Sequence, residues 1–340
     1  MDGCAGDKAD LGLRVGEGVE GPLGIGPRGD DKPHVQVILA APRGFCAGGR
    51  RAIDAVRDAL AKHGAPVFVR RAIVHNMEVV RALEAEGAIF VNELDEVPPG
   101  SVVLFSAHGV APGVARDAER RNLVAYDAVC PLVSKVHREV ERHERHGRKI
   151  ILIGHRGHPE ILGTLGHVST VEAHVVESVE EVERLPLKAS QPTAYAVQTT
   201  YSVDDAQAII EALRRRFSDL AGPPSSDICY ATTNRQLAVR DLAKRSDAVI
   251  VAGEQFSSNA CRLAEVASDH CAMVQLVGVP DQIDWTLLPR GGVIGITAAA
   301  STPEASVQSI LSALAGRYRV RVEEAGAEPE TTVFKRLELS

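Results

Sequence analysis

The stretch that decides the fold is Val35-Gln36-Val37-Ile38-Leu39-Ala40-Ala41-Pro42-Arg43-Gly44-Phe45-Cys46-Ala47-Gly48-Gly49-Arg50-Arg51-Ala52-Ile53. It begins as an apolar run of strand length, breaks at Pro42 and Gly44, and continues as an amphipathic helical pattern. We therefore expect Cys46 between the carboxyl end of a strand and the amino end of a helix. Proteins of the α/β class bind ligands at that edge, and the helix dipole favours a thiolate there. A single cysteine in such a turn is equally compatible with a buried structural residue.

The same arrangement occurs three times along the chain, after Cys46, Cys130 and Cys229. Each cysteine is followed by a predicted helix, at Arg50–Lys62, Leu132–His146 and Thr233–Lys244, and then by a strand, at Val67–Arg70, Ile150–Ile153 and Ala248–Val251. A polar loop lies 28 or 29 residues after each cysteine, at His75, His158 and Ser257. A second polar loop follows a later strand in each copy, at 106–109, 198–200 and 297–301. Three unrelated turn cysteines would not share this spacing.

The repeat predicts an α/β fold, a trefoil of three pseudo-symmetric small parallel α/β domains around a common centre. The predicted boundaries are a disordered tail over residues 1–34, units over 35–129, 130–228 and 229–320, and a C-terminal extension over 321–340. The tail is rich in glycine and has no periodic apolar pattern, so its Cys4 is interpreted as incidental. Cys261 and Cys271 have no counterparts in the other copies and are interpreted as core residues.

Composition excludes several classes of protein. The 340 residues carry a net charge of −7, which argues against a nucleic-acid-binding surface. No apolar run approaches the roughly 18 residues that a membrane span needs. Six cysteines are too sparse for a disulfide scaffold, and no secretory signal is visible. We therefore expect a protein of the reducing cytoplasm with no membrane and no nucleic-acid partner.

The repeated cysteines and polar loops predict a metal centre beside an anion site. Soft thiolates select zinc, copper(I) or iron–sulfur clusters, and the lack of a CxxC pair argues against structural zinc. Three protein ligands would leave one coordination position open. The loops supply hydrogen-bond donors suited to a phosphate, namely His75, His108, His158, Thr199, Ser257, Ser258, Asn259 and Ser301. Glu160 is the carboxylate among them and is a candidate proton donor, although after Pro159 it also suits the first turn of a helix.

Eight segments resemble the 4-hydroxy-3-methylbut-2-enyl diphosphate reductases, the LytB or IspH family. They are Pro42–Gly48, Val74–Asn76, Phe105–Val110, Cys130–Val133, Gly157–Glu160, Gln198–Thr200, Asp227–Gln236 and Ser257–Asn259. The resemblance extends from about Val35 to Arg319. The chain departs from the family pattern at Gly49, Phe256, Ala260 and Ala299, and none of these positions removes a candidate ligand.

The resemblance implies a trefoil around an oxygen-sensitive [4Fe–4S] cluster with three cysteine ligands and one open iron. The implied reaction reductively removes the allylic hydroxyl of a diphosphate substrate. It yields isopentenyl and dimethylallyl diphosphate, in the last step of the methylerythritol phosphate route, with two electrons from ferredoxin or flavodoxin. Carried over by motif, Cys46, Cys130 and Cys229 correspond to cluster ligands and Glu160 to the proton donor. His158 and Thr199 correspond to residues near the substrate hydroxyl, and the diphosphate cradle corresponds to His75, His108, Ser257, Asn259 and Ser301, with Ser258 nearby.

Two other functions fit parts of the pattern. An iron–sulfur redox sensor would need the three thiols but not the eight donors in register around them. A zinc-dependent phosphate-ester hydrolase would use the same thiolates with a different metal. Metal analysis distinguishes the iron–sulfur functions from the hydrolase: the former predict iron with acid-labile sulfide, and the latter predicts zinc.

Overall fold

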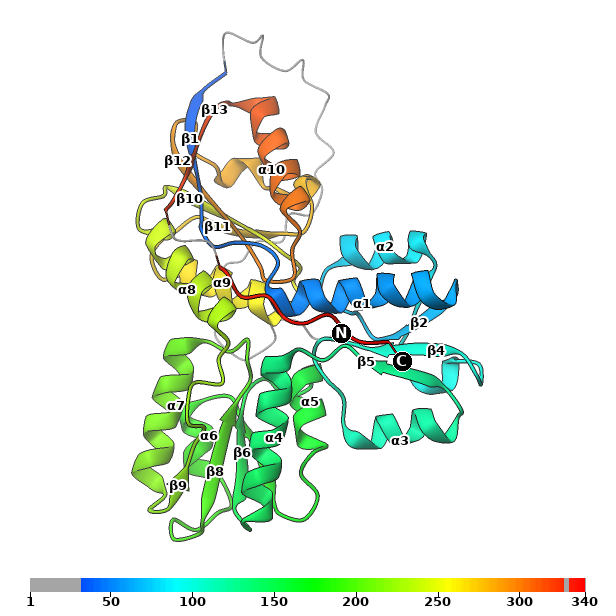
Figure 1. Cartoon of the computed structure of the whole chain (residues 1–340). Coiled ribbons are helices and arrows are strands. Elements are labelled where there is room, and N and C mark those ends of the chain that lie inside the picture. Colours follow the sequence, from blue (N-terminus) through cyan, green and yellow to red (C-terminus); the bar gives the residue numbers. More distant parts are fainter. Residues whose placement is uncertain (1–31, 327–329, 340) are drawn as a thin grey trace. The chain divides into compact units, whose positions relative to one another are not determined.

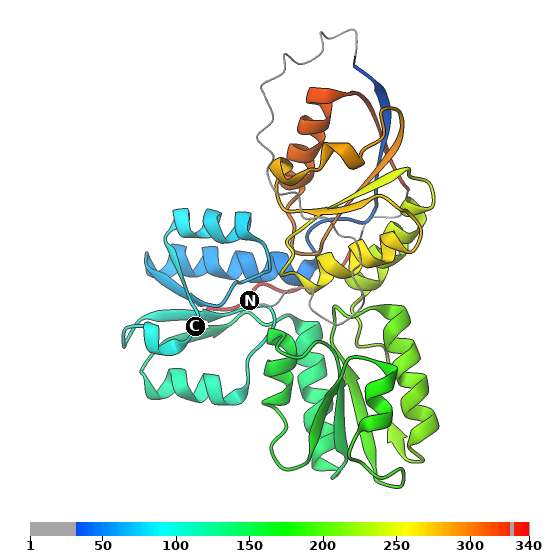
Figure 2. The same cartoon turned by 180° about the vertical axis from the view of Figure 1, so that it is seen from behind.

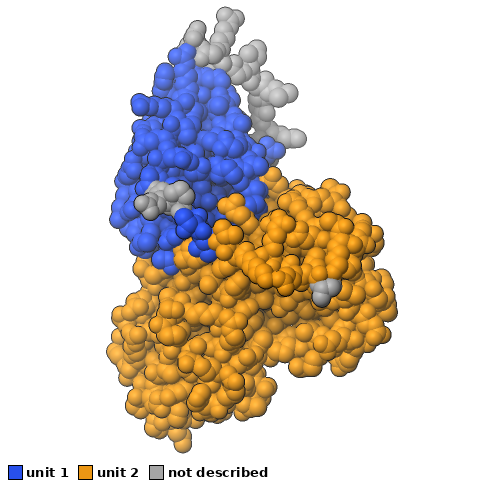
Figure 3. Space-filling model, viewed as in Figure 1, with its two compact units in different colours: residues 1–46, 231–332 blue, residues 47–230, 333–340 orange. Residues whose placement is uncertain are grey.

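The computed structural model describes residues 32–326 and 330–339, and these residues form three parallel sheets flanked by helices (Figures 1 and 2). The predicted α/β class with three small parallel sheets is confirmed. Most of the predicted tail, including Cys4, lies outside the described residues. The chain divides into two compact units, residues 1–46 with 231–332 and residues 47–230 with 333–340 (Figure 3). Among the helices of the described part, none is both long enough and apolar enough to cross a membrane.

The larger unit contains two four-stranded sheets. The first has the strand order β3-β2-β4-β5, and its strands are β2 (Val67–Arg70), β3 (Ala88–Val91), β4 (Val102–Phe105) and β5 (Val124–Asp127). Its helical elements are α1 (Ala47–His63), α2 (Met77–Glu86), η1 (Leu94–Glu96) and α3 (Pro112–Arg120). Asn76 begins α2, because its side chain accepts a hydrogen bond from the backbone of Val79 at 3.0 Å. Gly87 ends α2 with a positive φ of 109°.

The second sheet has the equivalent order β7-β6-β8-β9, with strands β6 (Lys149–Ile153), β7 (Ala173–Val176), β8 (Thr193–Val197) and β9 (Leu220–Ala221). Helices α4 (Pro131–Arg145) and α5 (Pro159–Leu165) pack on one face, and α6 (Val179–Arg184) and α7 (Val203–Arg216) on the other. After Lys149, strand β6 is apolar because both of its faces are covered: Ile151 packs toward α6 and α7, and Leu152 packs toward α4 and α5.

The smaller unit contains one five-stranded sheet in the order β11-β10-β12-β1-β13. Its strands are β1 (His34–Leu39), β10 (Ala248–Ala252), β11 (Val274–Val277), β12 (Gly292–Ala298) and β13 (Arg319–Glu324). Helices α8 (Tyr230–Ala243) and α9 (Ser258–Ser268) cover one face, and α10 (Glu304–Arg317) covers the other (Figure 1). Two short 3-10 helices, η2 (Pro280–Gln282) and η3 (Trp285–Leu287), connect β11 to β12.

Strand β1 differs from the predicted grouping. The predicted boundaries put it in the first unit and put residues 321–324 in an extension outside all units, whereas the structure pairs both segments in the third sheet. There β1 lies beside β12, as β5 lies beside β4 and β9 beside β8. Each cysteine therefore follows the strand in the fourth spatial position of its sheet, which is β1, β5 or β9. Hydrophobic patterns identify strands but not partners that lie some 250 residues away, so this pairing was not predicted.

The helices after the three cysteines start earlier than predicted, at Ala47, Pro131 and Tyr230. In α1 the first turn contains Gly48 and Gly49, which carry no apolar periodicity. The thiol-bearing residues consequently stand immediately before helix amino ends, where the helix dipole stabilises negative charge. Cys261 and Cys271 are buried, as expected of core residues.

Candidate functional site

Three histidines from three loops of the larger unit form one cluster. His75 follows β2, His108 follows β4 and His158 follows β6. The ring centroids of His75 and His108 are 4.2 Å apart, and the ring of His158 is 5.5 Å from that of His75 and 5.7 Å from that of His108. All three side chains are half-buried. The carboxyl edges of two separate sheets therefore contribute to a single group of imidazoles.

The histidine cluster is electrically neutral at pH 7. Burial lowers the pKa of His75 to about 4, and it holds the pKa values of His108 and His158 well below their usual range. Proximity to His75 lowers the other two further, since adjacent imidazolium ions repel one another. The backbone N–H of Glu160 donates to Nδ1 of His158 at 3.2 Å, so the proton of the neutral ring is on Nε2. The imidazole Nε2 of His158 is thus a hydrogen-bond donor.

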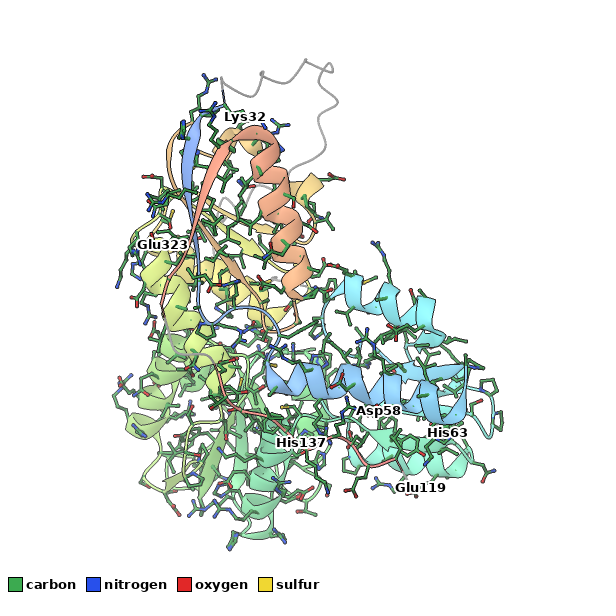
Figure 4. The ribbon with its side chains drawn as sticks, turned by 45° about the horizontal axis from the view of Figure 1, so that its top comes forward. Lys32, Asp58, His63, Glu119, His137 and Glu323 are labelled. Atoms are coloured by element: carbon green, nitrogen blue, oxygen red, sulfur yellow. The ribbon has the colours of Figure 1, made fainter. Side chains whose placement is uncertain are left out.

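A fourth histidine, which the sequence did not predict to be part of the site, packs against the backbone next to His108. The ring of His137, on α4 (Figure 4), packs against Gly109, and a Cβ at Gly109 would lie only 2.6 Å from its Cε1 atom. Gly109 also has a positive φ of 75°, so a side chain is excluded on both grounds. Burial lowers the pKa of His137 to about 3, and the neutral ring stacks on His167 with centroids 4.1 Å apart.

Glu160 lies in the first turn of α5 and is 2% exposed. Its carboxylate accepts two hydrogen bonds from Thr199, one from the backbone N–H at 2.6 Å and one from the hydroxyl at 2.8 Å. Burial raises the pKa of Glu160 to about 7, and the nearby Asp227 adds to the rise, although the bonds from Thr199 oppose it. A carboxyl group that is half-protonated near neutrality can donate a proton under physiological conditions.

The backbones of two cysteines are hydrogen-bonded to the loops that carry these side chains. The backbone N–H of Cys130 donates to Ala107 at 2.9 Å, next to His108, and that of Cys229 donates to Thr199 at 3.1 Å. The second loop is held further by the buried Asp227, whose Oδ2 accepts from the backbone N–H of Val197 at 3.1 Å. The sequence does not predict this role of Asp227, because an aspartate two residues before a cysteine gives no indication of its partner.

The smaller unit holds an equivalent group around Cys46. Its backbone N–H donates to Ala300 at 3.1 Å, and the N–H of Ala300 donates to Oδ1 of Asn259 at 2.7 Å. The hydroxyls of Ser257 and Ser301 are 3.5 Å apart. Ser257 caps the amino end of α9, where Ser258 is the first helical residue and is half-buried. The four predicted donors of this unit therefore come together at one helix terminus.

Asn259 is the feature of this group that points to a ligand. The side chain is 5% exposed, and its Nδ2 has no hydrogen-bond partner among the described residues. A buried amide donor without a partner is costly, which favours a bound acceptor at this position. Amide and hydroxyl donors at a helix amino end suit a phosphate oxygen.

Two departures from the family pattern have a packing explanation. Ala260 and Ala299 are fully buried on either side of Gly253, where a Cβ would lie 2.7 Å from the Cβ of Ala260 and 3.2 Å from that of Ala299. Small residues at these three positions let α9 approach the end of β10 closely. Neither alanine displaces a predicted donor.

The three thiols fit a soft metal group. Cys46, Cys130 and Cys229 are half-buried, and none of them is in a disulfide bond. Each donates its backbone N–H to the second polar loop of a sheet and precedes a helix amino end, where the helix dipole favours negative charge. Neither unit contains three of the thiols, and no ready-made metal cluster of His, Cys, Asp or Glu occurs among the described residues.

Comparison with known proteins identifies the family. The family model described as LytB protein matches residues 37–315. The chain is 49% identical over 306 residues to the 4-hydroxy-3-methylbut-2-enyl diphosphate reductase of Beijerinckia indica, covering 89% of this chain and 96% of the relative. It is 50% identical over 307 residues to the enzyme of that name from Paracoccus denitrificans, covering 90% and 97%.

Solved structures agree with the sequence relatives. The E-1-hydroxy-2-methyl-but-2-enyl-4-diphosphate reductase of Plasmodium falciparum superposes with a TM-score of 0.84 at 35% identity, covering 90% of this chain and 96% of that one. A second structure, described as the terminal enzyme of the non-mevalonate pathway, gives a TM-score of 0.60 at 27% identity and covers 83% and 99%. The chain therefore belongs to the LytB family of 4-hydroxy-3-methylbut-2-enyl diphosphate reductases.

Proposed function

We propose that this enzyme reductively removes the allylic hydroxyl of (E)-4-hydroxy-3-methylbut-2-enyl diphosphate at a [4Fe–4S] cluster. The products are isopentenyl and dimethylallyl diphosphate. The observation that carries the proposal is the pairing of a neutral histidine cluster with the buried Glu160–Thr199 contact, in loops attached to two of the thiols. Family membership and the relatives' names give independent support.

The proposed cluster ligands are Cys46, Cys130 and Cys229. When bound, such a cluster supplies electrons one at a time and leaves one Lewis-acidic iron open. We propose ferredoxin or flavodoxin as the donor of the two electrons, and the cytoplasm as the compartment, where thiols stay reduced. Thiolate ligands are favoured because each cysteine stands before a helix amino end.

The chain's own side chains account for binding and for one proton. His75 and His108 are proposed donors to the diphosphate, together with Ser257, Asn259 and Ser301, and Ser258 lies nearby. His158 and Thr199 are proposed to orient the hydroxyl that leaves. The reaction replaces a C–O bond by a C–H bond and consumes two electrons and two protons. Glu160 is the proposed source of the proton that leaves with the hydroxyl as water, because its carboxyl group holds a proton near pH 7.

The test is to purify the protein without oxygen and measure iron, acid-labile sulfide and zinc. Reduction with dithionite and a viologen mediator should then convert the substrate to the two diphosphate products. We expect close to four iron and four sulfide per chain and production of both products. Zinc in place of iron, or an iron–sulfur protein that turns over no substrate, would overturn the proposal.

Asn259→Asp separates the two roles of that side chain. The aspartate retains the oxygen that accepts from Ala300, but it replaces the unpartnered Nδ2 donor with negative charge. We expect KM for the diphosphate to rise about 10- to 150-fold, the value of a hydrogen bond to a charged group, with a smaller change in kcat. Asn122→Asp is the matched control, since Asn122 lies in a turn with a positive φ of 56° that aspartate also tolerates. An unchanged KM in Asn259→Asp would remove Asn259 from the phosphate site.

A further inference from the structure

Arg235, on α8, is a fully buried arginine whose donors are all used. The side chain is 1% exposed. Its Nε and Nη2 atoms donate to the carbonyl of Gly44 at 3.0 and 2.7 Å, and Nη1 donates to the carbonyl of Ala231 at 2.9 Å. Nη1 and Nη2 also donate to the carboxylate of Glu330 at 3.0 to 3.1 Å. The guanidinium thus joins the first turns of α8 to a loop and to the C-terminal segment.

Glu330 forms the ion pair with Arg235 and lies after β13, the last strand of the described residues. It lies in the part of the sequence that was predicted to be an extension outside the fold. Its side chain is only 14% exposed, and its Oε1 also accepts from Nδ2 of Asn234 at 3.1 Å. A guanidinium without water needs a bonded anion, because desolvation of an unpaired charge is strongly unfavourable. The carboxylate is therefore what allows Arg235 to remain buried and ordered.

What Arg235 holds is the turn that leads to Cys46. Gly44, two residues before the cysteine, has a positive φ of 69°, and its N–H donates to Ala298 at 3.1 Å. The N–H of Cys46 donates to Ala300 at 3.1 Å. These two backbone bonds hold the N–H groups of the turn to the end of β12 and the residues after it. The two bonds from Arg235 hold the same turn at the carbonyl of Gly44. Without the guanidinium, the carbonyl of Gly44 would have no partner on that side.

We propose that Glu330 is a positioning residue for the thiol of Cys46 and acts through Arg235. The C-terminal segment is then a part of the support for a thiol-bearing loop. The importance of this for catalysis rests on the proposed function, in which Cys46 binds the cluster. The positioning itself is a property of the protein fold and can be measured without turnover.

The test compares Glu330→Gln with Glu338→Gln in the full-length protein. Glutamine retains the shape and one acceptor but removes the charge opposite Arg235. Glu338 is a matched control in the same segment, because its side chain is 78% exposed and forms an ion pair with the exposed Lys335. Two rates are measured without oxygen: iron release to a ferrous chelator, and iodoacetamide labelling of each cysteine, resolved by peptide mass spectrometry. We expect both iron release and labelling of Cys46 to accelerate about 5- to 30-fold in Glu330→Gln, the range that follows from weakening one local equilibrium by one or two kcal/mol.

Labelling of Cys271 separates positioning from general destabilisation, because Cys271 is a free, buried cysteine of the same unit and is not a proposed cluster ligand. Equal acceleration at Cys46 and Cys271, or no acceleration at Cys46, would overturn the proposal. Glu330→Asp retains the charge and should lie closer to the wild-type rates than Glu330→Gln does, which keeps the test decisive if the glutamine variant is recovered poorly. If the wild-type protein binds no iron, the proposed function fails, but the contrast between Cys46 and Cys271 labelling still decides whether Glu330 positions the thiol.

Discussion

Glu160→Gln is expected to lower turnover by about 10²- to 10⁴-fold, the usual contribution of a general acid, while iron content and substrate binding are retained. Glutamine has the same shape and can still accept the bond from the backbone of Thr199, so the loop geometry is preserved. It has no proton to give to the departing hydroxyl. Glu119→Gln, at an exposed position on α3 (Figure 4), is the matched control and should turn over like the wild type.

The pH profile gives the same hypothesis a second test. The pKa of Glu160 is raised to about 7 by burial, so the acid form predominates below pH 7 and is lost above it. For the wild type, kcat/KM should be level at low pH and fall as the pH rises through about 7. A bound diphosphate adds negative charge nearby and moves the corresponding limb of kcat to higher pH. If Glu160→Gln retains the wild-type limb, or turns over within a few-fold of the wild type, the proton comes from another group and His158 is the first to replace.

Cysteine-to-serine variants are expected to fall into two classes. Serine at position 46, 130 or 229 should lose the visible absorbance and iron, and turnover should fall by more than about 100-fold, which is the upper range for disturbing a residue that only supports a metal ligand. Serine at 261 or 271 should retain the cluster, because both cysteines are core residues of the smaller unit. Iron and sulfide analysis with the ultraviolet–visible spectrum measures the difference.

A variant of the class that retains the cluster, Cys271→Ser, serves as the control for a loss of stability. Cys271→Ser places a hydroxyl in a buried position, so it should lower the melting temperature without releasing iron. Loss of the cluster from a folded Cys261 or Cys271 variant would contradict the threefold alignment of the sequence. Cys4 lies outside the described residues and is predicted to belong to the class that retains the cluster.

Local signals in the sequence predicted much of the fold. Strand β2 was predicted with the bounds that the structure has, since an apolar run between turn residues defines both of its ends. The matched spacing of three cysteines predicted three equivalent sheets, and the order of four strands agrees in all three, although β13 adds a fifth strand to one of them. The rule that parallel strands end at one edge of a sheet predicted that His75 and His108 lie together. That His158, from a second sheet, joins them rested on the predicted arrangement of the three units around a common centre.

Long-range contacts could not be predicted in this way. The hydrogen bonds between Glu160 and Thr199 depend on how α5 sits above β8, and periodicity carries no information about that. The pairing of Arg235 with Glu330 joins residues 95 positions apart, across a strand that the boundaries left outside the fold. Nothing in the sequence around His137 indicates its contact with Gly109. In each case the partner is chosen by tertiary packing, which overrides local pattern.

The place of β1 in its sheet sets the order of events during synthesis. Among the strands of the described residues it is the first to be made, yet both of its neighbours, β12 and β13, are encoded more than 250 residues later. At ordinary translation rates this strand spends on the order of 10–50 s without its sheet partners. During this time its apolar side chains are exposed and can be bound by chaperones. The turn that ends in Cys46 cannot form before Ala298 and Ala300 are made. Any group that needs this thiol in its folded position must therefore be inserted after residues 298–300 have been made.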